Sequence, residues 1–235
     1  FGSSHFGSSS AVQFASRIPQ PLSPAAMAGS TPMLWCLLAW TAAMPGGAFP
    51  RPPYSEHAKV ARWLVHESDY AVSSTACSSV RLGCAFKGQP FGDIMSVSDG
   101  NGTEHSTGIV YTYLPGLDSA TEDILADPRM TLTFSEKALG CNTTAEDPPC
   151  ARLTIAGKLT PVPEGEHSET ALQYLFARHP QMKPWSMAHT FKPYWMAKED
   201  ISSFFFIDFY GGATEMSVEE YLAASPVTTP EPIHV

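Results

Sequence analysis

Basic residues are scarce in this sequence. Its 235 residues include 14 Lys and Arg against 23 Asp and Glu, so the formal net charge is −9, and charged residues make up 16% of the chain. Nucleic-acid binding depends mainly on Lys and Arg side chains that neutralise phosphates. The acidic balance therefore argues against a nucleic-acid partner, and it also disfavours binding to an anionic membrane surface.

Short motifs of catalysis and cofactor binding are absent as well. The chain has no G-x-G-x-x-G, P-loop, G-x-S-x-G or H-E-x-x-H. His57 and His66 are nine residues apart and share no ligand face, whereas His179 and His189 could each line a cleft. Lone histidines without Cys or carboxylate at ligand spacing do not make a metal site. We therefore predict no catalytic, cofactor-binding or metal-binding residues, although chain order alone leaves a Ser-His-Asp triad open.

No apolar run is long enough to cross a membrane. The run at residues 33–44 has about the length of a signal-peptide core. Pro32 and Pro45 bracket this run, which disfavours the alternative of a buried helix. Small residues up to Ala48 suit a signal peptidase. The sequence therefore predicts a signal peptide over residues 27–48, cleavage after Ala48, and a secreted protein that does not insert into the membrane.

The first 26 residues differ in composition from the rest. They contain no acidic residue and one basic residue, Arg17, and they show no hydrophobic period. One interpretation of residues 1–26 is a disordered tail. We favour a non-native leader, with the true start at Met27 or Met33.

Asparagine occurs only twice, and both residues lie in acceptor sequons. These are Asn101-Gly102-Thr103 and Asn142-Thr143-Thr144, in two turn-like stretches. A single sequon is weak evidence, but a chain with every Asn in one is more informative. The sequence predicts N-glycosylation at Asn101 and Asn142.

Four cysteines remain after removal of Cys36 with the signal peptide, and they allow three pairings. Pairing between sequence neighbours, Cys77–Cys84 and Cys141–Cys150, is the simplest. The second staple would close a polar loop and contribute on the order of 2–3 kcal/mol. The alternative is four unpaired thiols in a reducing compartment. No C-x-x-C is present, which makes zinc or thioredoxin-type chemistry improbable.

Apolar periodicity predicts about six strands and three or four short helices. Strands are expected over residues 71–76, 91–98, 108–114, 130–134, 153–159 and 204–210, with a bulge at Gly157. Helices are expected over residues 54–67, from a capping box at Ser119 to before Pro128, over 166–178, and from a capping box at Ser217 through Leu222. Strands that follow one another without helical crossovers indicate an antiparallel barrel or sandwich with helices outside. One domain is predicted over residues 49–224, with a disordered tail at 225–235.

The strand at residues 204–210 is apolar on both faces. One face can join the core, and the other needs a helix or a second subunit. We interpret this aromatic strand as core or dimer interface rather than as a ligand box.

Several segments resemble the CREG family of secreted glycoproteins, in the right order and across residues 54–222. The segments are 61–70 (ARWLVHESDY), 88–100 (GQPFGDIMSVSDG), 127–133 (DPRMTLT), 150–154 (CARLT), 178–185 (RHPQMKPW) and 208–212 (DFYGG). The resemblance implies a mainly β, six-stranded antiparallel split β-barrel with peripheral helices, related to flavin-mononucleotide-binding proteins such as the pyridoxamine-phosphate oxidases. It also implies a homodimer that does not bind flavin, because the cofactor cleft is obstructed.

The resemblance further implies a secreted or endolysosomal, non-enzymatic glycoprotein. Such a protein acts in growth and differentiation control, partly through a mannose-6-phosphate receptor that recognises its glycans. The pair Cys141 and Cys150 resembles the cysteine pair in the same loop of the family.

Two departures from the family stand out. Tyr70-Ala71 replaces the commoner Trp-Gly. The stretch around Cys77 and Cys84 is longer than usual in the family, so the resemblance implies no disulfide between these two residues. The glycosylation of Asn101 and Asn142 rests on the sequons alone.

The alternative function is a flavin-dependent oxidoreductase that kept the cofactor of the split-barrel superfamily. A flavin phosphate needs clustered donors. The candidates are Arg129, Lys137, Arg152 and Lys158, which are thinly spread and equally well explained as exposed strand ends.

Overall fold

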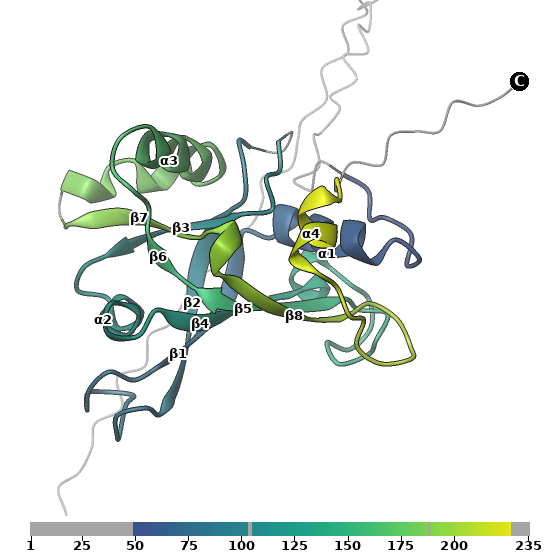
Figure 1. Ribbon diagram of the computed structural model, residues 1–235, viewed down its shortest axis with the longest axis horizontal. Coiled ribbons are helices and arrows are strands. Elements are labelled where there is room, and N and C mark those ends of the chain that lie inside the picture. Colours follow the sequence, from purple (N-terminus) through teal and green to yellow (C-terminus); the bar gives the residue numbers. More distant parts are fainter. Residues whose placement is uncertain (1–48, 103–104, 188, 227–235) are drawn as a thin grey trace, which may run out of the picture. The chain divides into compact units, whose positions relative to one another are not determined.

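An antiparallel sheet of eight strands is the centre of the protein. The computed structural model describes residues 49–102, 105–187 and 189–226. Within these residues the strands are β1 (Tyr70–Ala76), β2 (Pro90–Ser98), β3 (Val110–Pro115), β4 (Arg129–Ser135), β5 (Arg152–Lys158), β6 (Thr160–Pro161), β7 (Phe191–Met196) and β8 (Ile201–Ile207). Their order in the sheet is β6-β7-β3-β2-β1-β4-β5-β8 (Figure 1). The predicted leader and signal peptide, and the predicted tail from residue 227, lie outside the described residues.

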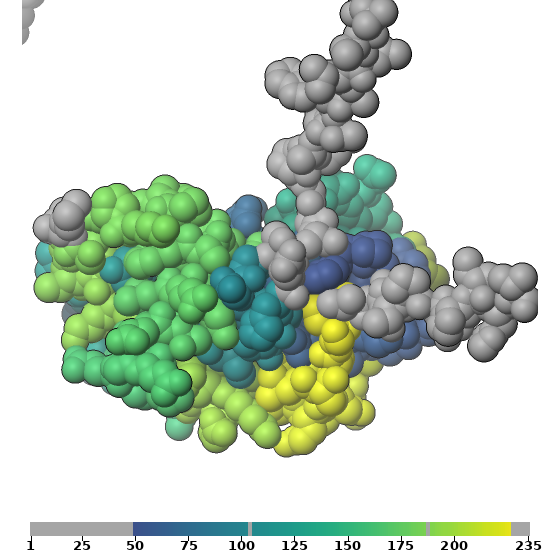
Figure 2. Space-filling view, turned by 90° about the horizontal axis from the view of Figure 1, so that it is seen from above, coloured from purple at the N-terminus to yellow at the C-terminus, as the bar shows by residue number. Residues whose placement is uncertain are grey.

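Helices cover the sheet at two places. In the described residues they are α1 (His57–Glu67), α2 (Ser119–Ala126), α3 (Glu166–Arg178) and α4 (Val218–Ala223). Four 3-10 turns lie in the connections: η1 (Glu136–Leu139), η2 (Pro180–Met182), η3 (Trp185–Met187) and η4 (Lys198–Asp200). Helix α1 packs against α4, β4 and β5, whereas α3 packs against β2, β3 and β7. In the view of Figure 2, α3 lies on one side in green, and α1 and α4 lie on the other side in blue and yellow. None of the described helices is long and apolar enough to span a bilayer.

The two packed regions correspond to two clusters of buried side chains. In the larger one, Leu64 of α1 meets inward residues of β4 and β5 such as Leu132 and Ile155. In the smaller one, Tyr111 and Tyr113 of β3 meet the apolar side of α3. The predicted apolar stripes of α1, α3 and β3 are thus confirmed as core-facing surfaces.

The strand count is eight and not six, because β6 and β7 were not predicted. Strand β7 contains Pro193, and proline lacks the N–H that a central strand needs. The strand tolerates it because its outer neighbour β6 is only two residues long and pairs with Tyr194 and Trp195. The carbonyl oxygen of Pro193 still accepts a bond from the N–H of Val162.

The predicted bulge at Gly157 is confirmed by a shift in the β5–β8 register between Ala156 and Gly157. A Cβ atom at Gly157 would lie 2.5 Å from the carbonyl oxygen of Asp200 and 2.8 Å from the sulfur of Met196. Only glycine therefore allows β5 to lie so close to η4 and to the end of β7.

Side-chain caps set the starts of α4 and α2. The predicted capping box at α4 is confirmed, with Ser217 and Glu220 exchanging bonds with each other's backbone N–H. At α2 the predicted cap was wrong by one residue, because the carboxylate of Asp118, and not Ser119, accepts from the N–H of Thr121.

Helices α1 and α4 are joined by the buried guanidinium of Arg62, which is 2% exposed. Its Nη1 donates to the carbonyl oxygens of Tyr221, Leu222 and Ala224 at 3.3, 3.1 and 2.8 Å, at the carboxyl end of α4. Its Nη2 donates to the backbone oxygen and the hydroxyl of Ser106. One charged side chain of α1 therefore supplies the partners for the last carbonyls of α4.

A disulfide joins Cys77 and Cys84 in the β1–β2 connection, with the two Cα atoms 5.9 Å apart. Arg81 inside this loop donates to the buried carboxylate of Asp123 on α2 at 2.7 Å. Burial alone would raise the pKa of Asp123. Hydrogen bonds from the side chain of Arg81, from the backbone N–H and side chain of Ser78, and from the side chain of Thr75 outweigh burial and lower this pKa below its usual value. The stapled loop is thus attached to α2 by a charged bond.

Candidate functional site

Both asparagines of the predicted sequons are exposed. Asn101 lies in the turn after β2, and Asn142 lies in the loop between η1 and β5. Exposure is a condition for a bulky glycan on a folded surface.

The four cations considered for a flavin phosphate do not gather at one place. Arg129 is opposite Lys158 at one end of the β4–β5 ladder, and Arg152 is opposite Ser135 at the other end. A strand of this length spans about 20 Å. Lys137 lies beyond the second end, where its amine donates to the carbonyl oxygens of Cys141 and Thr143. The ladder therefore keeps two of these cations apart from the other two.

Each of the four histidines considered from the sequence has a different environment. His57 contacts the buried carboxylate of Asp208 at 3.0 Å, and His66 contacts that of Asp99 at 2.6 Å. His179 is buried and bonded to the carbonyl oxygen of Val97. His189 lines a small apolar pocket with Trp185 and Phe191. In the part of the chain that the structure describes, no three His, Cys, Asp or Glu residues are grouped as a metal site.

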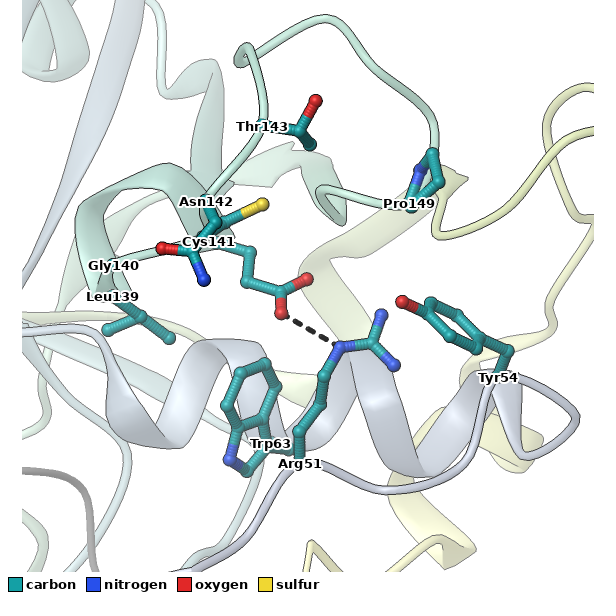
Figure 3. Close-up of a pocket in the computed structure, with 10 residues that line it drawn as sticks. Arg51, Tyr54, Trp63, Leu139, Gly140, Cys141, Asn142, Thr143 and Pro149 are labelled. Atoms are coloured by element: carbon teal, nitrogen blue, oxygen red, sulfur yellow. Dashed lines mark hydrogen bonds and ion pairs between the residues drawn. The ribbon is translucent and has the colours of Figure 1, made fainter.

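A pocket of about 460 Å³ lies directly beside Asn142. One wall comes from the segment that leads into α1, with Arg51 and Tyr54, and from Trp63 on α1 itself (Figure 3). The opposite wall is η1 and the loop after it, which includes Asn142. The Asn142 side chain points from this loop toward Leu139 and Trp63 in Figure 3. The volume is in the range of roughly 300–1,000 Å³ that is typical of small-molecule sites.

Arg51 and Glu136 form the polar centre of this pocket. The Nε of Arg51 donates to Glu136 Oε1 at 2.8 Å, and the other carboxylate oxygen accepts from the N–H of Ala151. The guanidinium lies 4.0 Å above the ring of Tyr54. Its Nη2 atom is buried and has no hydrogen-bond partner. The pocket is therefore close to neutral in charge.

The loop that carries Asn142 is held in place from two directions. The amine of Lys137 holds two of its carbonyl oxygens, those of Cys141 and Thr143. In addition, the Thr143 hydroxyl donates to the carboxylate of Asp147 at 2.5 Å. The other oxygen of the same carboxylate accepts from the hydroxyl of Tyr210 at 2.9 Å. Lys137 of η1 and Tyr210, which follows β8, thus hold this wall of the pocket in place together with Asp147 of the loop itself.

The structure differs from the expected second disulfide, since Cys141 and Cys150 are free thiols. Cys150 is completely buried. Burial raises the pKa of the Cys150 thiol to about 12, and the neighbouring Cys141 thiol adds to the shift. A thiol with such a pKa stays protonated near neutral pH and is not a nucleophile. Cys150 is therefore a buried structural thiol and not an activated cysteine.

This environment predicts unequal alkylation of the two thiols. At pH 8 we expect iodoacetamide to modify Cys141 at least about tenfold faster than Cys150, because only a very small fraction of Cys150 is thiolate. Raising the pH toward 11 should narrow the difference, since the thiolate fraction of Cys150 grows as the pH approaches its raised pKa. Mass spectrometry of the peptides measures both rates.

Equal rates at pH 8 would contradict the burial of Cys150. If neither residue reacts until a reductant is added, the two are joined in the disulfide that the sequence predicts.

The outer face of the sheet carries an uncharged row across five strands. Successive cross-strand partners are Ile94 (β2), Val72 (β1), Thr133 (β4), Thr154 (β5) and Phe205 (β8). Ile94, Val72 and Phe205 are 58%, 42% and 51% exposed. The next row consists of Gly92, Ser74, Thr131, Ala156 and Ser203. We call these two rows the outer sheet face. The strand that was expected to be apolar on both faces thus has Phe206 in the core, Phe204 against Tyr221 of α4, and Phe205 exposed.

Comparison with solved structures places this architecture among known folds. A heme binding protein from Mycobacterium smegmatis superposes with a TM-score of 0.56 at 16% sequence identity, covering 74% of this chain and 62% of that chain. Protein Atu2129 from Agrobacterium tumefaciens, described as of unknown function, gives a TM-score of 0.54 at 16% identity, covering 73% and 63%. The fold is mainly β, an antiparallel sheet with peripheral helices, as the sequence resemblance implied.

Sequence comparison then identifies the family. Residues 52–223 match the family model described as CREG, beta-barrel. The chain is 35% identical over 176 residues to Protein CREG1 of Mus musculus, which covers 73% of this chain and 76% of that protein. It is 33% identical over 174 residues to Protein CREG2 of Mus musculus, covering 72% of this chain and 57% of that longer protein. The chain belongs to the CREG family.

Sequence reasoning found Asn142 and Cys141 but missed the pocket beside them. Arg51 and Glu136 are 85 residues apart in the chain. No periodicity or motif connects them, so only the packing of α1 against the β4–β5 region could reveal the site.

Proposed function

We propose that this protein is a secreted, N-glycosylated member of the CREG family that acts through contacts with other proteins and not as an enzyme. One observation supports this most directly: the chain has only two asparagines, and both are exposed residues in acceptor sequons. The apolar run at residues 33–44 supports an entry into the secretory pathway. Glycans made there would allow recognition by a mannose-6-phosphate-type receptor and delivery to endolysosomes, and growth and differentiation control would follow from such contacts.

The proposed assembly is a homodimer that pairs the outer sheet faces. These faces are uncharged, partly apolar and continuous across five strands, which is the composition expected at the centre of an interface.

A flavin-dependent oxidoreductase is the alternative. The split-barrel fold favours it, since flavin-binding proteins use this architecture. The separation of Arg129 and Lys158 from Arg152 and Lys137 weakens it, because a phosphate needs donors that converge.

Secretion and glycosylation are tested together by expressing the chain from residue 27 in eukaryotic cells. We expect protein in the medium, an N-terminus near residue 49, and two glycopeptides that contain Asn101 and Asn142. Each of the variants Asn101→Gln and Asn142→Gln should lose one glycan by mass spectrometry. Protein that stays inside the cell with both sequons unmodified would refute the proposal.

A further inference from the structure

We infer that the pocket between Arg51, Tyr54 and Trp63 holds the first N-acetylglucosamine of the glycan on Asn142. The inference rests on the proposed glycosylation and goes beyond it, because it assigns a binding site on the protein to the attached sugar. Asn142 itself lines the pocket, and its side chain points toward Leu139 and Trp63 (Figure 3). A sugar joined to this side chain therefore begins at the pocket entrance.

The polar groups of the pocket match a neutral, acceptor-rich ligand. Arg51 lines the pocket, and its guanidinium only donates hydrogen bonds. The acetamide and hydroxyl oxygens of N-acetylglucosamine are acceptors. Glu136 already balances the charge of Arg51 at 2.8 Å, so the site has little surplus charge to hold an anion such as phosphate.

The apolar surfaces match the other side of such a sugar. Tyr54 is held by Arg51 on one side and by the ring of Phe209, whose centroid is 5.0 Å away. Trp63 is fixed because its indole N–H donates to the carbonyl oxygen of Phe49 at 3.0 Å. The C–H face of a sugar ring packs on aromatic side chains, and Leu139 offers an apolar surface for the acetamide methyl group.

Covalent attachment makes even weak contacts effective. A tethered group has an effective concentration in the millimolar range for short flexible links, so the sugar needs little intrinsic affinity to occupy the pocket. Its loop is also fixed beforehand by Lys137, Asp147 and Tyr210. Little ordering of the protein is then needed when the sugar docks.

The sequon offers a clean pair of variants. Thr144→Ala removes the acceptor site, and Thr144→Ser keeps it. Thr144 is exposed, and only its backbone oxygen takes part in a hydrogen bond. The full chain secreted from cells that make high-mannose glycans is first checked by mass spectrometry for occupancy of Asn142. We expect Thr144→Ala to lower the Tm by about 2–4 °C, on the scale expected for a modest interaction in a domain of this size. Thr144→Ser should have the wild-type Tm.

Three further measurements distinguish a contact of the first sugar with the pocket from effects of the outer glycan, of the sequon substitution and of the other glycan. Endoglycosidase H leaves one N-acetylglucosamine on each asparagine, and we expect it to leave the Tm unchanged. Tyr54→Leu should lower the Tm of the glycosylated protein more than it lowers the Tm of the Thr144→Ala variant, because the ring and the sugar are coupled. Thr103→Ala, which removes the sequon of Asn101, should not change the Tm.

The outcomes distinguish the two proposals. If Asn142 is occupied but Thr144→Ala has the wild-type Tm, or if endoglycosidase H lowers the Tm as much as Thr144→Ala does, the pocket does not hold the first sugar and the glycosylation stands. If Tyr54→Leu has equal effects in both backgrounds, the aromatic wall is not the contact and the inference is overturned. If Asn142 is unoccupied, the glycosylation at this site fails and the inference fails with it.

Discussion

Replacing Arg62 with Met is expected to lower the free energy of unfolding by about 3–5 kcal/mol. The guanidinium makes five hydrogen bonds, three of them to carbonyl oxygens at the end of α4 and two to Ser106. Methionine fills a similar volume but leaves these buried and part-buried acceptors without their donor. The hydroxyl of Ser106 also donates to Asp99 at 2.5 Å, so the loss extends to the buried carboxylate next to His66.

Urea unfolding followed by circular dichroism measures this effect. Arg129→Met is the matched control, because Arg129 also forms a close ion pair, with Asp127, but its side chain is 79% exposed. We expect the control to leave the unfolding midpoint nearly unchanged. Equal midpoints for the wild type and Arg62→Met would contradict the role of Arg62 in joining α1 to α4.

Placing a charge on the outer sheet face is expected to break the proposed dimer. Phe205→Glu puts a carboxylate at the edge of the uncharged row, where it would be buried without a partner in the dimer. Burial of an unpaired charge costs at least about 3 kcal/mol, which corresponds to about a hundredfold weaker association. Light scattering at micromolar concentration should change from dimer to monomer.

Leu125→Glu provides the control for an added charge. Leu125 is 62% exposed on α2 and does not belong to the outer sheet face. This variant should remain dimeric, and both variants should keep the wild-type circular dichroism spectrum because each replaced side chain is exposed in the single chain. A wild-type protein that is monomeric, or a dimer that tolerates Phe205→Glu, would refute the proposed interface.

Local sequence signals predicted much of the fold because they act over a few residues. The apolar stripe predicted α3 over residues 166–178, as observed. The Ser217 and Glu220 pair identified the start of α4, and Gly157 identified the bulge. Strand β7 was missed because Pro193 is unfavourable in a strand taken alone, and only its position beside the short β6 makes it acceptable.

The candidate site was only half predictable for the same reason. The sequon at Asn142 is a three-residue pattern and can be read directly. The pocket beside it forms only after the segment around Arg51 meets η1, and that contact depends on long-range packing. The buried partners of His57 and His66 were also not predicted, since Asp208 and Asp99 are 151 and 33 residues away from them.

We propose that this protein acts through its surface and not as a flavin enzyme. The most direct test is the visible absorbance and fluorescence of the secreted protein, before and after addition of flavin mononucleotide. We expect a colourless protein and no saturable change on titration, because Arg129 and Arg152 lie at opposite ends of the β4–β5 ladder and cannot converge on one phosphate. A flavin that copurifies with the protein, or saturable uptake of added flavin mononucleotide, would contradict the claim and favour the oxidoreductase.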